Sequence, residues 1–122
     1  MKALVLSAGG MFGAYQAGVW KALAGRFKPD LVIGASVGSL NAWAIAGGGS
    51  PDDLVESWLA PECRELARVR FLQPPWRGCF DSRPLHAKIQ RLWASYRPRI
   101  PITVIATELP VYRLVVCQAW KD

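Results

Sequence analysis

Apolar and polar positions along the chain predict a repeated order of strand and helix. Short, continuous apolar runs at 3–7 and 31–35 have the length and composition of buried strands. Each run precedes a segment that we expect to be helical, at about 13–24 and 37–46. Parallel strands need helical crossovers between them, so this order favours an α/β fold with a mainly parallel sheet flanked by helices.

The second half of the chain continues with two helical segments and a pair of strands. The run Ser50-Pro51-Asp52-Asp53 predicts a helix start, with serine at the N-cap, proline at the first position and acids in the first turn. We expect this helix to reach about residue 70, with a break at Pro61. A loop, a further helix and two strands are then expected at about 71–83, 84–96, 102–106 and 111–118.

Length and composition predict one compact domain over residues 1–122. An apolar content of 52% is typical of a globular protein rather than a disordered one. The three cysteines Cys63, Cys79 and Cys117 lack zinc-ligand spacing and Cys-x-x-Cys, so we expect reduced thiols and a cytoplasmic setting. Glycine and polar residues interrupt the apolar runs, so we expect no targeting signal and no membrane span.

The strongest chemical signal is the run Gly34-Ala35-Ser36-Val37-Gly38, directly after the second apolar strand. A G-x-S-x-G that closes a strand and opens a helix is the nucleophile-elbow pattern. The turn exposes the serine hydroxyl, and the following helix N-terminus favours the oxyanion formed when serine attacks a carbonyl. The alternative is that Ser36 only caps the following helix.

A glycine-rich loop, Ala8-Gly9-Gly10-Met11-Phe12-Gly13, follows the first strand and opens the first helix. Such a loop turns backbone N–H groups outward and cradles either a phosphate or an oxyanion. Dinucleotide binding would need an acidic residue after the second strand, and a P-loop would need Gly-Lys-Ser/Thr. Neither is present, so the loop is better explained as an oxyanion cradle beside Ser36.

On these two motifs the chain resembles the patatin-like lipid acyl hydrolases. The run from Ser7 to Val19 is close to the first block of the bacterial members, and 34–42 is closer still to their nucleophile block. A looser match at 101–109 is similar to the strand and turn that follow in that family. The resemblance covers about residues 2–119. Phe12 departs from the pattern, because a basic residue is common at this position.

The resemblance implies a Ser–Asp dyad that cleaves esters of glycerolipids, phospholipids or simple acyl esters, of the lipase or phospholipase A type. Ser36 would be the nucleophile, backbone N–H groups of Gly9, Gly10 and Met11 would form the oxyanion hole, and no metal or organic cofactor would be needed. The family places its aspartate in an Asp-Gly motif, and the chain contains no Asp-Gly. We therefore expect the N-terminal portion of such a domain, with the fold incomplete.

Several sources of the catalytic acid stay open. A triad of Ser36, His86 and Asp81 respects the order of α/β-hydrolases, although His86 is also explained as a residue of an exposed helix turn. Glu108 and Asp122 are further candidates, and an oligomer contact is another. The alternative to catalysis is a deficient patatin-like domain that binds a lipid or a partner without turnover.

Basic residues are concentrated in one third of the chain. The net charge is +6, and the basic residues between Arg64 and Arg99 are interleaved with aromatic ones such as Trp76 and Phe80. This segment is either a solvated face or a peripheral contact with an anionic membrane surface, where each basic residue contributes about 1 kcal/mol. Nucleic acid is the last alternative, because the motifs point to a lipid.

Overall fold

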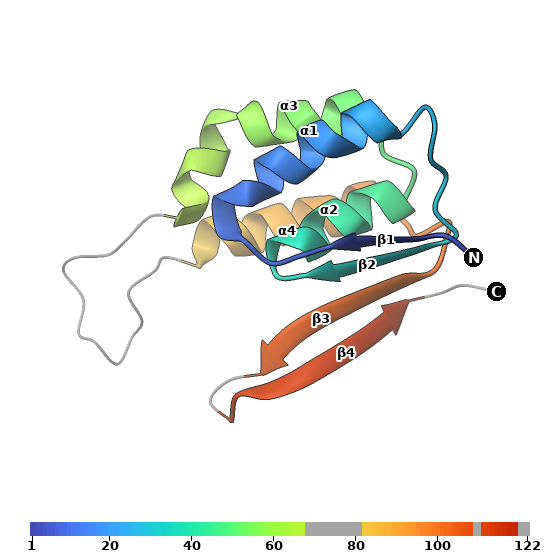
Figure 1. The fold of residues 1–122 in the computed structure, drawn as a ribbon. Helices are drawn as coiled ribbons and strands as arrows, with labels where there is room; N and C mark the ends of the chain where they lie inside the picture. The colour runs from blue at the N-terminus through green and yellow to red at the C-terminus, as the bar shows by residue number, and fades with distance from the viewer. Residues whose placement is uncertain (68–81, 109–110, 120–122) are drawn as a thin grey trace, which may run out of the picture.

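The computed structural model describes residues 1–67, 82–108 and 111–119 and has the expected mixed α/β fold. Four helices pack on one side of a four-stranded sheet (Figure 1). The elements, in chain order, are β1 (Ala3–Leu6), α1 (Gly13–Leu23), β2 (Leu31–Ala35), α2 (Val37–Ala46), α3 (Pro51–Leu59), α4 (Arg83–Ser95), β3 (Ile102–Glu108) and β4 (Arg113–Ala119), with 3₁₀ turns at Gly10–Phe12 and Pro61–Ala67.

The elements lie where the sequence predicts them, with shifts at a few ends. The helix from Pro51 ends at Leu59, and the predicted break at Pro61 is confirmed. The next helix begins at Arg83 and the last strand at Arg113, later than the expected 111 because Tyr112 has a positive φ of 50°. Most of the loop expected at 71–83 lies outside the described residues.

The sheet has the order β1-β2-β3-β4, with the first three strands parallel and β4 antiparallel to β3. The chain steps across the sheet in one direction from β1 to β3. Right-handed crossovers that step in one direction place their helices on the same face. Figure 1 shows this result, with α1, α2, α3 and α4 all above the sheet.

The core fills the space between the sheet and these helices. Apolar side chains from alternate strand positions point into it, because successive residues of a strand face opposite sides. The buried apolar residues are Leu6, Ala17, Trp20, Val32, Ala42, Ala44, Ile45, Ala46, Leu54, Trp58, Cys63 and Ile102.

The opposite face of the sheet carries apolar side chains that no described element covers. Val5 on β1 is 66% exposed, and Leu114 and Val116 on β4 are 65% and 56% exposed. Parallel strands usually have both faces covered, so the exposure of Val5 is unusual for a strand of this kind.

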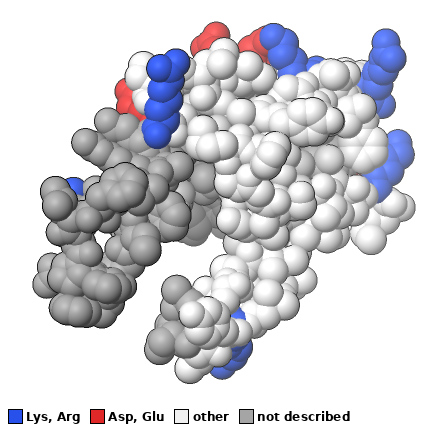
Figure 2. Space-filling view, turned by 60° about the vertical axis from the view of Figure 1, so that its left-hand side comes forward, with Lys and Arg blue, Asp and Glu red and all other residues white. Residues whose placement is uncertain are grey.

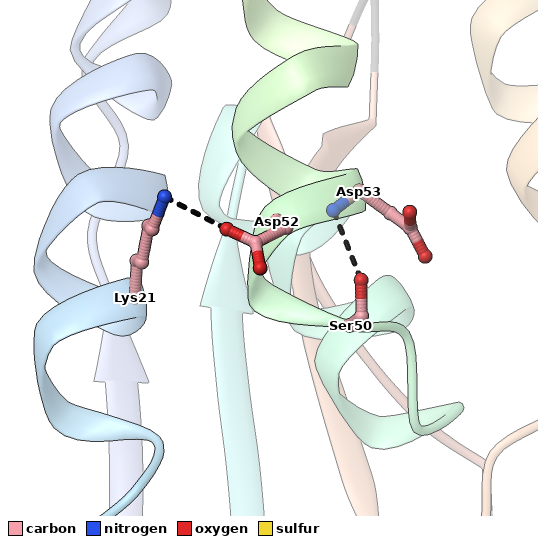
Figure 3. A network of polar contacts seen from close by, with 4 residues as sticks. All are labelled: Lys21, Ser50, Asp52 and Asp53. Carbon is pink, nitrogen blue, oxygen red and sulfur yellow. Dashed lines mark hydrogen bonds and ion pairs between the residues drawn. The ribbon is translucent and has the colours of Figure 1, made fainter.

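Helices α1 and α3 are joined at the surface by one ion pair near a helix cap (Figure 3). The Ser50 hydroxyl accepts a hydrogen bond from the Asp53 backbone N–H at 3.0 Å, as the predicted N-cap requires. Lys21 on α1 lies 2.7 Å from the Asp52 carboxylate, and this hydrogen bond raises the pKa of Lys21. Because both side chains are exposed, water screens the pair.

Two further expectations concern the state of the cysteines and a membrane span. Cys63 is buried and Cys117 is exposed, and both are free thiols, whereas Cys79 lies outside the described residues. Among the helices that the structure describes, none is long and apolar enough to cross a membrane.

Candidate functional site

Ser36 occupies the sharp turn between β2 and α2. Its backbone has φ 52° and ψ −123°, a combination that costs a non-glycine residue about 1–3 kcal/mol. The residue is exposed, and its side chain makes no capping hydrogen bond to α2. The capping explanation for this serine therefore finds no support in the contacts, and the strained turn presents the hydroxyl to solvent at the helix N-terminus.

The two glycines of the motif allow close packing around this turn. A Cβ on Gly34 would lie 2.6 Å from the Gly38 carbonyl oxygen, and a Cβ on Gly38 would lie 2.2 Å from the Leu6 carbonyl oxygen. Neither glycine has a positive φ; the unusual backbone conformation is at Ser36 itself. The glycines thus let α2 approach the ends of β1 and β2.

The glycine-rich loop lies beside the turn. Gly10 has a φ of 54°, which favours glycine, and the Phe12 N–H donates to the Gly9 carbonyl at 3.0 Å. The backbone N–H groups of Gly10 and Met11 donate a hydrogen bond to no described residue. Free N–H groups in such a loop are the chemistry that an anionic oxygen requires.

One pocket of about 650 Å³ brings the serine and this loop together. Ser36, Gly10 and Met11 line the same pocket, whereas Gly9 is not part of its wall. The pocket lies where β1, β2 and β3 end at their carboxyl termini, the usual ligand-binding edge of an open α/β sheet.

The rest of the pocket wall is mainly apolar. Its apolar side chains come from three helices and two strands: Leu40 on α2, Trp58 on α3, Leu85 and Ile89 on α4, Val104 and Ile105 on β3, and Leu114 on β4. Within the described part of the chain, no Asp, Glu or His side chain lines this wall. The pocket therefore offers a nucleophile, backbone donors and an apolar surface.

The sequence-based candidates for the acid lie in different places. His86 lines a separate hollow on α4, where its Nε2 is 3.2 Å from the Gln90 side-chain nitrogen. Glu108 forms a hydrogen-bonded ion pair with Arg113 across the β3–β4 hairpin. Asp81 and Asp122 fall outside the described residues, so the triad of Ser36, Asp81 and His86 stays a prediction.

Sequence reasoning assigned no role to three residues that lie beside the loop. Asn41, Gln16 and Trp58 form a hydrogen-bonded chain between α1, α2 and α3. Asn41 is a single amide in the apolar stretch 37–46. An isolated polar residue on such a helix indicates a buried side chain that forms hydrogen bonds.

The basic segment is only partly described. Several described members make contacts within the protein, among them Lys88 with the Ser57 carbonyl, Arg91 with the Ala87 carbonyl and Arg97 with the Trp93 carbonyl and ring. On the face shown in Figure 2, Lys and Arg side chains stand apart from one another, with uncharged surface and some acidic side chains between them. Arg68, Arg70 and Arg77 lie outside the described residues.

Comparison with known proteins identifies the family of the chain. The family model of the patatin-like phospholipases matches residues 4–111, which is most of the chain. The chain belongs to the patatin-like phospholipase family. Its activity at the level of the family is therefore lipid acyl hydrolysis. No curated protein and no solved structure was found to match the chain.

Proposed function

We propose that the protein is a serine acyl hydrolase in which Ser36 attacks the ester carbonyl of a glycerolipid, a phospholipid or a simple acyl ester. The observation that carries this proposal is the shared pocket, in which the exposed Ser36 faces the same space as the free N–H groups of Gly10 and Met11. Attack joins Ser36 Oγ to the carbonyl carbon and moves negative charge to the carbonyl oxygen. Backbone donors beside that oxygen stabilise the charge.

The first part of the reaction releases the alcohol and leaves the acyl group on Ser36 Oγ. Water then attacks the acyl-serine and releases the fatty acid, which restores the serine. The serine proton must pass to a base, and a base accelerates such a step by about 10²–10⁴-fold. The described residues of the pocket wall include no carboxylate or imidazole for this role. The base must therefore be a residue that does not belong to this described wall.

The apolar wall of the pocket supports an acyl chain as the part of the substrate that is bound there. A volume of about 650 Å³ falls within the range of small-molecule sites, about 300–1,000 Å³. Leu85 and Ile89 on α4 would contact the chain, while the ester carbonyl lies at Ser36.

The test compares wild type with Ser36→Ala in two assays. One measures turnover of a short-chain p-nitrophenyl ester, and the other measures labelling by a serine-directed phosphonate probe. We expect Ser36→Ala to lose both turnover and labelling. The matched control is Ser39→Ala, since Ser39 lines the same pocket but its Oγ is buried. Labelling that persists in Ser36→Ala, or disappears in Ser39→Ala alone, would contradict the assignment of the nucleophile.

A second candidate is lipid binding without turnover. The observation in its favour is the described pocket wall, which contains no acid or base. In that case anionic vesicles would bind both wild type and Ser36→Ala, and neither protein would react with the phosphonate probe. Rapid labelling at Ser36 would exclude this candidate, because a serine without activation reacts slowly.

A further inference from the structure

Asn41 is the buried polar residue of the described core, with a side chain that is only 1% exposed. Its Nδ2 donates to the Gly13 carbonyl at 2.9 Å and to Gln16 Oε1 at 3.0 Å. Its Oδ1 accepts from Trp58 Nε1 at 2.8 Å. The partners fix the orientation of the amide, because an indole N–H can only donate and a backbone carbonyl can only accept.

Gln16 extends this chain to the start of the glycine-rich loop. Its Nε2 donates to the Ser7 carbonyl at 2.7 Å, and its Oε1 accepts from Asn41. Ser7 directly precedes the loop, and Gly13 is its last residue. The two amides therefore hold the carbonyl groups at both ends of the loop.

Asn41 also lies on the helix that begins beside the nucleophile. Helix α2 starts at Val37, so Asn41 is five residues after Ser36, on its second turn. A rigid helix turn therefore connects Ser36 to the residue that holds the loop. The distance between the serine and the free N–H groups depends on two amide side chains rather than on the loop alone.

We propose that Asn41 and Gln16 are positioning residues that hold the backbone donors of Gly10 and Met11 in place relative to Ser36. This inference rests on the proposed function. Oxyanion donors act within about 2.7–3.1 Å of the developing charge, and a displacement of about 1 Å can cost about 100-fold in rate. Loss of either amide should thus slow the reaction of Ser36 while the apolar pocket remains.

The sharpest variant is Gln16→Glu. The introduced carboxylate can still accept from Asn41 Nδ2, so the buried amide keeps its partner. A carboxylate cannot donate to the Ser7 carbonyl, so the start of the loop is released. Gln16 is only half-buried, so the fold should tolerate this change. Asn41→Asp is the companion variant, because it removes both donations to the loop side and keeps an oxygen toward Trp58.

The experiment measures the rate constant for phosphonate labelling of the 122-residue chain. We expect this rate constant to fall about 10- to 100-fold in Gln16→Glu and in Asn41→Asp. A purely structural effect would lower the fraction of protein that labels and leave the rate constant of the remainder unchanged. Ser50→Ala is the control for lost stability, because it weakens the cap of α3 away from the pocket.

A pH series gives a second readout. A protonated carboxyl at position 16 can again donate to the Ser7 carbonyl, so labelling of Gln16→Glu relative to wild type should recover as the pH falls from 8 toward the usual pKa of glutamic acid, about 4.3. Wild-type rate constants in Gln16→Glu at pH 8 would overturn the positioning role and leave the proposed function intact. Wild type without labelling at Ser36 would overturn the proposed function, and this inference with it.

Discussion

The close approach of α2 to the end of β1 predicts a large effect of Gly38→Ala. A Cβ at this position would lie 2.2 Å from the Leu6 carbonyl oxygen and 2.8 Å from the Ser7 carbonyl oxygen. Ordinary carbon–oxygen contacts are about 3.3 Å or longer. Because the clashing atoms belong to the backbone, a rotamer change cannot relieve them. Strand and helix must separate locally by about 1 Å.

Two opposing contributions decide the sign of this effect. Replacement of glycine by alanine inside a helix stabilises a protein by about 1 kcal/mol. Overpacking of a tight contact costs about 1–3 kcal/mol, and the upper end applies here because the backbone must move. We expect a net loss of about 2 kcal/mol in the free energy of unfolding. At about 4 °C per kcal/mol for a domain of this size, the midpoint of melting falls by about 8 °C.

The matched control is Gly18→Ala in the middle of α1, where an added Cβ meets no heavy atom within 4 Å. Only the gain in helix propensity applies there, so the free energy of unfolding should rise by about 1 kcal/mol. Thermal melting followed by circular dichroism measures both variants. A Gly38→Ala protein that melts at or above the wild-type temperature would refute the packing argument, whatever Gly18→Ala does.

The other predictions concern the surface contact between α1 and α3. Ser50→Ala removes the acceptor for the Asp53 N–H and should lower the free energy of unfolding by about 1 kcal/mol in urea titrations; an unchanged midpoint would contradict the capping role. Lys21→Met should cost less than Ser50→Ala, because the ion pair with Asp52 is exposed. The pKa of Lys21 is raised in the folded protein, so its contribution is present below its usual pKa, about 10.4, and lost as pH rises through the folded value. The difference in melting temperature between wild type and Lys21→Met should therefore shrink from pH 8 to pH 11, and a growing difference would be evidence against the pair.

Much of this fold could be predicted from the sequence because its signals are local. The apolar runs, the cap at Ser50 and the break at Pro61 each depend on neighbouring residues, and the structure has all of them. The position of Ser36 at a turn between strand and helix was equally predictable. Ends of elements were less so: the start of β4 depends on the backbone conformation of Tyr112, which no composition rule indicates.

The contacts that build the site depend on tertiary packing and were therefore out of reach. Nothing local says that a Cβ on Gly38 would meet the Leu6 carbonyl, or that Asn41 bonds to Gln16. The pocket wall likewise requires α4 to lie over the ends of the strands, which places Leu85 within it. Such pairings join residues that are far apart in the chain, so they follow only from the packed arrangement.

The register of the sheet explains why two distant motifs meet at one pocket. Leu6 pairs with Gly34, so β1 and β2 end at the same level and their following turns leave the sheet side by side. A shift of β2 by one residue would move Ser36 by about 3.3 Å along the strand and turn Val32 out of the core. Burial of Val32 therefore opposes such a shift. The same apolar pattern that specifies the sheet also sets the distance between the serine and the loop donors.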